Sequence, residues 1–259
     1  MNEREKSDER VVPKKRPNKG RVTTRTAEGV EGRRSTKGNS LAETKDRTQS
    51  RATLQQDLQR VREAAARSRD QQLTSLWHHC CKVDHLRTVF FDLKKRSAPG
   101  VDGVTWTSYS EDLGNRLQDL SSRLARGAYR AKPVRRTYIP KPDGRLRPLG
   151  IPTLEDKIVQ GMTKRVLEQV YEQEFLGFSY GSRPGRNTHM ALDALCTAIS
   201  RKKVSWVLDA DIRGFFDAID HDCLMQLVER RIGDQRVLRH IKKWLNAGVL
   251  EDGKKTRAE

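Results

Sequence analysis

Two carboxylates, Asp209 and Asp211, stand two residues apart in Val204–Ile212, a segment whose pattern is typical of a strand. Because strand side chains alternate between faces, both carboxylates are predicted on one face, opposite a wholly apolar one. Such a pair suits a hard cation such as Mg²⁺, which combines one or two carboxylates with substrate phosphates. That arrangement is typical of phosphoryl transfer. The alternative is that these acids are solvated or cap the next helix, which Asp220 or Asp222 could do.

A second group of residues suited to binding lies between Tyr129 and Arg147. Asp143-Gly144 separates two strand-like runs, which predicts a β-hairpin with arms at residues 134–140 and 145–151. Basic side chains interleaved with aromatic ones suit a surface that follows a nucleic-acid backbone, and the alternative is a merely solvated hairpin. The basic residues are Arg130, Lys132, Arg135, Arg136, Lys141, Arg145 and Arg147, and the aromatic ones are Tyr129 and Tyr138.

The run His78-His79-Cys80-Cys81, followed by His85, contains residue types that bind zinc. Adjacent ligands on one chain rarely close a tetrahedron, and the sequence offers no second ligand pair. We therefore predict packing and surface roles for these residues. Catalysis of the Ser/His/Asp or Cys/His kind has no support in the sequence.

Composition narrows the class of protein. The 259 residues carry a formal net charge of +18 and a pI near 10.1, which favours a polyanionic partner, with nucleic acid first and an anionic membrane surface second. No apolar run is long enough to span a bilayer, and the N-terminus lacks the apolar core of a secretory signal. Four cysteines without a CxxC pair favour a reduced compartment, so we predict a cytoplasmic location.

The elements that must position these groups follow from periodicity. Residues 1–53 are basic and lack aromatic residues, which predicts a disordered tail, and order is expected from Leu54. Helices are predicted from residue 54, over 86–95, over 113–124 with a stop at Gly127, from Thr153, and over 187–200, 223–231 and 235–246. A strand at 204–212 and a last hairpin at Asp252-Gly253 complete a mixed α/β (α+β) fold with helices packed behind a sheet.

Four stretches, in order, resemble the motifs of group II intron-encoded reverse transcriptases. The first catalytic palm motif of that family resembles Asp209-Ala210-Asp211-Ile212-Arg213-Gly214-Phe215-Phe216-Asp217-Ala218-Ile219-Asp220-His221. The other three matches are Ala98–Gly103 (an early fingers motif), Tyr138–Pro152 running on to Glu155–Gln160 (a hairpin and helix), and Phe178–Arg186. The resemblance covers nearly everything after the tail.

This resemblance implies the fingers (residues 54–203, with an N-terminal extension) and the start of the palm (204–259) of a right-hand polymerase. The implied activity is RNA-directed DNA polymerisation with Mg²⁺, together with binding of intron RNA and help in its splicing. The implied partners are intron RNA, an RNA template with a DNA primer, and deoxynucleoside triphosphates.

The resemblance also assigns roles to individual residues. Asp211 would be the catalytic, metal-binding carboxylate, and Ile212 would lend its backbone carbonyl to a metal. Phe216 would lie under the sugar of the incoming nucleotide. Asp209 either faces the site or orients its neighbours. Lys141 and Arg147 would contact the triphosphate, and Arg183 joins the hairpin residues Arg130, Lys132, Arg135, Arg136 and Arg145 as a nucleic-acid contact.

Two departures from the family pattern shape the expected activity. Ser182 stands where the third block of the family has Phe, which could loosen packing against the template channel. The 259 residues contain no Asp-Asp pair, so the second catalytic motif, Tyr-Ala-Asp-Asp, is missing, and we expect a chain cut before it and inactive alone. The alternatives are a non-catalytic RNA-binding fragment and a nuclease-like phosphotransferase that uses Asp209, Asp211 and Asp217.

Overall fold

The computed structural model describes residues 41–256 apart from residues 143, 203, 217 and 252, and the side chains from residue 48 onward. The predicted tail therefore lies largely outside the described residues. Helix α1 begins at Leu41, so the predicted boundary at residue 53 is wrong. Among the described helices, none has the length and apolar character needed to cross a membrane.

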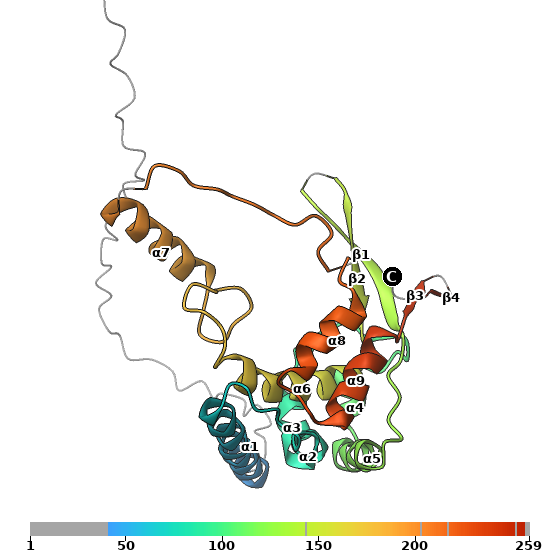
Figure 1. The fold of residues 1–259 in the computed structure, drawn as a ribbon. Coiled ribbons are helices and arrows are strands. Elements are labelled where there is room, and N and C mark those ends of the chain that lie inside the picture. The colour runs from blue at the N-terminus through green and yellow to red at the C-terminus, as the bar shows by residue number, and fades with distance from the viewer. Residues whose placement is uncertain (1–40, 143, 203, 217, 252, 257–259) are drawn as a thin grey trace, which may run out of the picture. The chain divides into compact units, whose positions relative to one another are not determined.

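A helical body forms the centre of the described chain (Figure 1). Its amphipathic helices pack because each presents one apolar stripe. In α5 the residues at spacings of three and four, Leu117, Leu120 and Leu124, are completely buried. The helices of this body are α1 (Leu41–Arg67), α2 (Trp77–Cys81), α3 (Val83–Asp92), α4 (Trp106–Ser110), α5 (Leu113–Ala125) and α6 (Leu154–Tyr171).

Helix α6 contacts α1, α2 and α3 and is the centre of this packing. It starts where the sequence predicts, because the Thr153 side chain accepts a hydrogen bond from the Asp156 backbone N–H. A Cβ on Gly161 would lie 2.8 Å from Val89 Cγ1, so this glycine, an apparent defect in the sequence pattern, lets α3 and α6 approach closely. The buried stripe of α6 is Ile158, Val159, Met162, Val166 and Val170.

Residues near the C-terminal end of the described chain pack against the helical body. Helices α8 (His221–Glu229) and α9 (Gln235–Leu245) pack on each other, and Asp234 before α9 accepts hydrogen bonds from the backbone N–H groups of Leu76 and Trp77, at 2.8 and 2.7 Å. The buried guanidinium of Arg231 donates to the carbonyl of Ala65 at 3.0 Å. Residues 65–77 and 231–234 are therefore packed together, although more than 150 residues separate them in the sequence.

Four strands form one sheet in the order β2-β1-β3-β4. Strands β1 (Val134–Pro140) and β2 (Leu146–Ile151) form the predicted hairpin, and β3 (Val249–Glu251) and β4 (Lys254–Thr256) form the predicted last hairpin. The two hairpins join through a parallel pairing of β1 with β3, in which Val134 lies opposite Val249.

The predicted strand over residues 204–212 is wrong. The described part of this segment has no regular secondary structure, and Figure 1 draws it as an extended connection between α7 (Thr188–Arg201) and α8. A strand is stable only beside a partner whose N–H and C=O groups it can pair with, and no described strand lies next to this segment. Its apolar side chains are consequently open to solvent, with Trp206 92% exposed.

Candidate nucleic-acid interface

The basic hairpin β1–β2 has the antiparallel register that its turn demands. Ile139 lies opposite Arg147, and the Lys141 N–H donates to the Arg145 carbonyl at 2.7 Å to close the tip. Gly144 has a φ of 79°, which explains the Asp-Gly signal in the sequence. Lys141, Arg145 and Arg147 are exposed. Three of the five predicted basic residues on this hairpin are therefore exposed.

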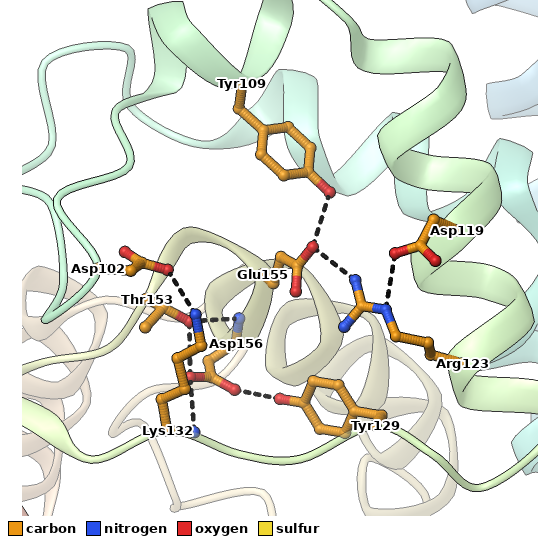
Figure 2. Close-up of polar contacts among 9 residues, drawn as sticks. All are labelled: Asp102, Tyr109, Asp119, Arg123, Tyr129, Lys132, Thr153, Glu155 and Asp156. Atoms are coloured by element: carbon orange, nitrogen blue, oxygen red, sulfur yellow. Dashed lines mark hydrogen bonds and ion pairs between the residues drawn. The ribbon is translucent and has the colours of Figure 1, made fainter.

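The base of the hairpin is held by the buried carboxylate of Asp156 (Figure 2). This side chain accepts hydrogen bonds from the Tyr129 hydroxyl, from the Thr153 hydroxyl at 2.7 Å and from the Lys132 N–H at 3.3 Å. Hydrogen bonds to a buried charged acceptor are among the stronger ones in proteins. The chain entering β1 is thereby fixed to the first turn of α6.

Tyr129 is a structural residue, which corrects the prediction that it shares the nucleic-acid surface. Its ring is buried, and its hydroxyl also accepts a hydrogen bond from Trp244 Nε1 at 3.2 Å. Burial, reinforced by the nearby Asp156 carboxylate, raises the pKa of Tyr129 well above its usual value. The hydroxyl therefore stays protonated and available as a donor to Asp156.

Glu155, the residue before Asp156, ties α6 to α5 (Figure 2). It accepts from Arg123 at 2.7 Å and from the Tyr109 hydroxyl at 3.5 Å, and Arg123 also donates to Asp119 at 2.7 Å. The hydrogen bond to Glu155 is the largest cause of a raised pKa at Arg123. This chain of contacts extends the anchoring of the hairpin into the helical body.

The loop at residues 98–103, which resembles the early fingers motif, packs against the junction of hairpin and helix. A Cβ on Gly100 would lie 2.6 Å from Thr153 Cα, a distance that only glycine avoids. Arg135 Nε donates to the Pro99 carbonyl at 3.1 Å, and Lys157 Nζ donates to the Ala98 carbonyl at 2.7 Å. Burial lowers the pKa of Lys157, and the nearby Arg135 adds to this effect.

Several predicted nucleic-acid contacts already have protein partners. Lys132 pairs with Asp102 at 3.2 Å, and Arg136 lies 3.9 Å from a carboxylate oxygen of Glu251. Arg135 is engaged at Pro99, whereas Arg130 is exposed. The structure therefore separates residues that brace the hairpin from residues that it leaves open, a distinction that a count of basic residues could not make.

The predicted nucleic-acid contact Arg183 has a structural position. Its guanidinium pairs with Glu172 at 3.0 Å, donates to the carbonyls of Leu176 and Ser179, and lies over the ring of Phe175 at 4.8 Å. With these donors engaged, Arg183 holds the loop after α6 together. We correct its assignment on this ground, since a phosphate would have to displace several existing bonds.

The predicted catalytic residues are not assembled with the hairpin in this structure. Asp209, Asp211 and Ile212 lie in the exposed segment after α7, and Phe216 is 84% exposed with its ring against Phe215 at 5.3 Å. Within the described residues, no hydrogen bond or ion pair links Asp211 to Lys141 or Arg147. The carboxylates have the right chemistry for a hard cation, but among the described residues they belong to no cluster of three or more potential metal ligands.

Comparison with known proteins gives these residues a context. Residues 139–259 match the family described as reverse transcriptase (RNA-dependent DNA polymerase). Protein YkfC of Escherichia coli is 40% identical over 163 residues, which cover 62% of this chain and 43% of that protein. The group II intron-encoded protein LtrA of Lactococcus lactis subsp. cremoris is 33% identical over 199 residues, covering 75% of this chain and 32% of that protein. The chain thus spans less than half the length of these relatives.

A third relative is an intron protein from a eukaryote. The "uncharacterized 91 kDa protein in cob intron" of Schizosaccharomyces pombe is 43% identical over 122 residues, covering 47% of this chain and 15% of that protein. The recurrence of intron-encoded proteins among these relatives agrees with the motif resemblance in the sequence.

Proposed function

Because this chain belongs to the reverse transcriptase family and is related to group II intron-encoded proteins, we propose that it supplies the fingers and the start of the palm of an RNA-directed DNA polymerase. Its proposed partners are intron RNA, an RNA template with a DNA primer, and deoxynucleoside triphosphates. Help in splicing of the intron RNA and a cytoplasmic location belong to the same proposal.

The observation that carries this proposal is the anchored basic hairpin. Its base is fixed through Asp156 and Tyr129, while Lys141 and Arg147 are exposed. An anchored support with exposed cations suits binding of phosphates, because little further order has to be imposed when the ligand arrives. Lys141 and Arg147 are the proposed triphosphate contacts, and Arg130 and Arg145 are proposed to contact the nucleic-acid backbone.

Divalent metal ions are general in this family, and Mg²⁺ is the proposed ion here, with Asp211 and the Ile212 carbonyl as its proposed ligands. The fit is incomplete, because Asp211 lies on an exposed segment without strand partners and these 259 residues contain no Asp-Asp pair. Two-metal transfer needs carboxylates that bracket both ions. We therefore propose that the 259 residues alone bind RNA without extending a primer.

RNA binding is tested by the salt dependence of affinity. We expect the triple variant Arg130→Gln, Lys141→Gln, Arg147→Gln to flatten the slope of log affinity against log salt by roughly 0.7–0.9 per lost phosphate contact. The matched control removes the same charge from α1 and its end, by Arg62→Gln, Arg67→Gln and Arg69→Gln. Equal slopes in the two variants would place the RNA surface away from the hairpin.

The polymerase part of the proposal is tested by primer extension with Mg²⁺ or Mn²⁺. The unmodified 259-residue chain and its Asp211→Ala variant should both bind primer–template, and neither should extend it. Extension by the unmodified chain that disappears in Asp211→Ala would show that fewer carboxylates suffice than we propose. Cleavage of RNA without any nucleoside triphosphate would instead support the nuclease-like alternative.

A further inference from the structure

Three buried side chains from two separate parts of the chain converge between α1, α2 and α3. Asp57 comes from α1, His79 from α2 and His85 from α3, and one ligand atom from each lies within 4.8 Å of the others. Asp57 and His79 are each 6% exposed and His85 is fully buried. The sequence prediction of packing and surface roles for these histidines overlooked Asp57, because it lies in another helix.

The tautomer of His85 makes this cluster unusual. Its Nδ1 lies 2.8 Å from the His79 carbonyl, which can only accept, so the ring N–H is on Nδ1. Nε2 of the neutral ring then carries a lone pair, and it lies 3.2 Å from Asp57 Oδ2. Two facing acceptors of this kind are stabilised either by a proton shared between them or by a cation that both can bind.

His79 presents a similar unpartnered nitrogen. Its Nδ1 lies 3.8 Å from Asp57 Oδ2, and neither this atom nor His85 Nε2 has a hydrogen-bond partner among the described residues. An unprotonated imidazole nitrogen without a hydrogen-bond partner is the form in which histidine binds a metal.

Two cations already face the carboxylate. Lys82 Nζ donates to Asp57 Oδ2, and Arg60 lies 3.7 Å from the other carboxylate oxygen. The side chain of Lys82 is 43% exposed and that of Arg60 is 69% exposed, so both can turn into solvent. The Lys82 ammonium contacts the same carboxylate oxygen as the two histidine nitrogens and is therefore a competitor for the position that a metal ion would take.

We propose that Asp57, His79 and His85 form a binding site for a divalent transition-metal ion of the Zn²⁺ class, with Lys82 as its displaceable competitor. The donor set of two imidazoles and one carboxylate is typical of zinc. With zinc–ligand bonds of about 2.0–2.1 Å, ligand atoms in a tetrahedron lie roughly 3.3 Å apart, close to the 3.2 and 3.8 Å separations here. The hydrogen bond from His85 Nδ1 to a carbonyl is the support that metal-bound histidines usually have.

Such an ion would stabilise the fold and would take no part in catalysis. The site is distant in sequence from the proposed catalytic segment and lies among packed helices. It would join α1 to the α2–α3 pair at a point where hydrophobic contacts are interrupted by charge. Cys80 and Cys81 contribute no atom to this cluster, and Cys80 Sγ instead lies 3.8 Å from Thr163 Oγ1. The cysteines in the sequence run are therefore not the ligands.

The test is a titration of the metal-free 259-residue chain with Zn²⁺, followed by metal analysis after dialysis, and with Co²⁺, followed by its visible absorption. We expect one ion per chain and a rise in Tm on binding. Lys82→Met should bind about tenfold more tightly or better, because a like charge leaves the site. His79→Gln should bind about tenfold more weakly or worse, and the exposed neighbour His78→Gln should bind like the unmodified chain.

Two outcomes would overturn the proposal. One is the absence of stoichiometric uptake by both the unmodified chain and Lys82→Met, and the other is equal affinity in His79→Gln and His78→Gln. If His79→Gln does not fold, the Co²⁺ spectra of the unmodified chain and Lys82→Met still decide, because Lys82 is a half-exposed residue outside the hydrophobic core. A spectrum typical of six-coordinate Co²⁺ in water would then reject the site.

Discussion

Helices α5 and α7 are similar in length, with 13 and 14 residues, and each has an apolar stripe. In α5 three residues of this stripe, Leu117, Leu120 and Leu124, are completely buried, whereas α7 buries none of its residues. Leu192 and Leu195 in α7 are 60% and 46% exposed. An apolar stripe therefore tells which face of a helix could be covered, and the rest of the fold decides whether anything covers it.

The segment after α7 is not helical, and its apolar side chains are also left uncovered. Trp206 and Leu208 are 92% and 91% exposed, although their spacing is that of one apolar strand face. The described chain thus has a packed body, which holds the hairpin, and an open part from α7 to residue 216, which holds the proposed metal ligand Asp211. The following predictions test whether substitutions in these two parts change the free energy of unfolding by different amounts, as their difference in burial implies.

The largest difference is expected between equivalent leucines. Leu120→Ala in α5 should lower the free energy of unfolding by about 3 kcal/mol, because it removes buried surface and leaves a cavity. Leu192→Ala in α7 should change it by less than about 0.5 kcal/mol, because that side chain is exposed. Urea denaturation measures both values. Similar losses would mean that α7 is packed in solution.

Acid should weaken the body through its buried histidines. Burial lowers the pKa of His79 to about 4, below its value of 6.5 in the unfolded chain, so the unfolded state binds more protons below pH 6.5. The stability that the folded state gains from a neutral His79 is fully present above pH 6.5 and is lost as the pH falls from 6.5 towards 4. Between pH 7.5 and pH 5 we expect a loss of about 2 kcal/mol from this residue.

The comparison for this pH effect uses two histidine variants, measured with a chelator present to keep metal ions out. His79→Gln should flatten the dependence of unfolding free energy on pH, while His189→Gln in the exposed helix α7 should leave it unchanged. An unchanged slope in His79→Gln would assign the acid sensitivity to other groups in the body.

Two glycines give a smaller and sharper contrast. Gly100→Ala should destabilise the protein by about 1.5 kcal/mol or more, because the new Cβ would meet the Thr153 backbone at 2.6 Å. Gly114→Ala in α5 should stabilise it by about 0.5–1 kcal/mol, because that position has open space and alanine is the better helix former. Thermal unfolding of both variants checks the signs, and equal signs would contradict the close approach of the loop at 98–103.

The smallest difference is expected between two helix caps. Thr153 and Asn187 each accept a hydrogen bond from the first turn of a helix, α6 and α7 respectively. Thr153→Ala should cost about 1 kcal/mol of global stability, whereas Asn187→Ala should fray α7 without moving the global transition. Circular dichroism and urea midpoints separate local fraying from global unfolding. A lower midpoint for Asn187→Ala would show that α7 unfolds together with the body.

Local patterns predicted much of the packed body. The Asp143-Gly144 pair indicated the β1–β2 hairpin, leucine spacing indicated α5, and Thr153 indicated the start of α6, all of which the structure confirms. These features depend on residues close in sequence. A turn or a cap is decided by a few neighbouring dihedral angles and hydrogen bonds, so its signal is complete within a short window.

The wrong predictions concern contacts between distant residues. Alternation in residues 204–212 described a possible strand face, but strand formation depends on a neighbour that alternation cannot supply. Tyr129 looked like a surface aromatic because Asp156, its buried partner, lies 27 residues away. Arg183 looked like a free cation because its acceptors Glu172 and Leu176 are ordinary residues in the sequence. In each case the missing information was the partner.

The parallel pairing of β1 with β3 has a consequence for the order of folding during synthesis. Val134 cannot meet Val249 until the ribosome has released the later residue, and the N–H groups of Leu76 and Trp77 likewise wait for Asp234. At about 5–20 residues per second the nascent hairpin is exposed for several seconds or more before β3 arrives. Its basic side chains then meet the RNA-rich surroundings of the ribosome while one edge of β1 is still unpaired.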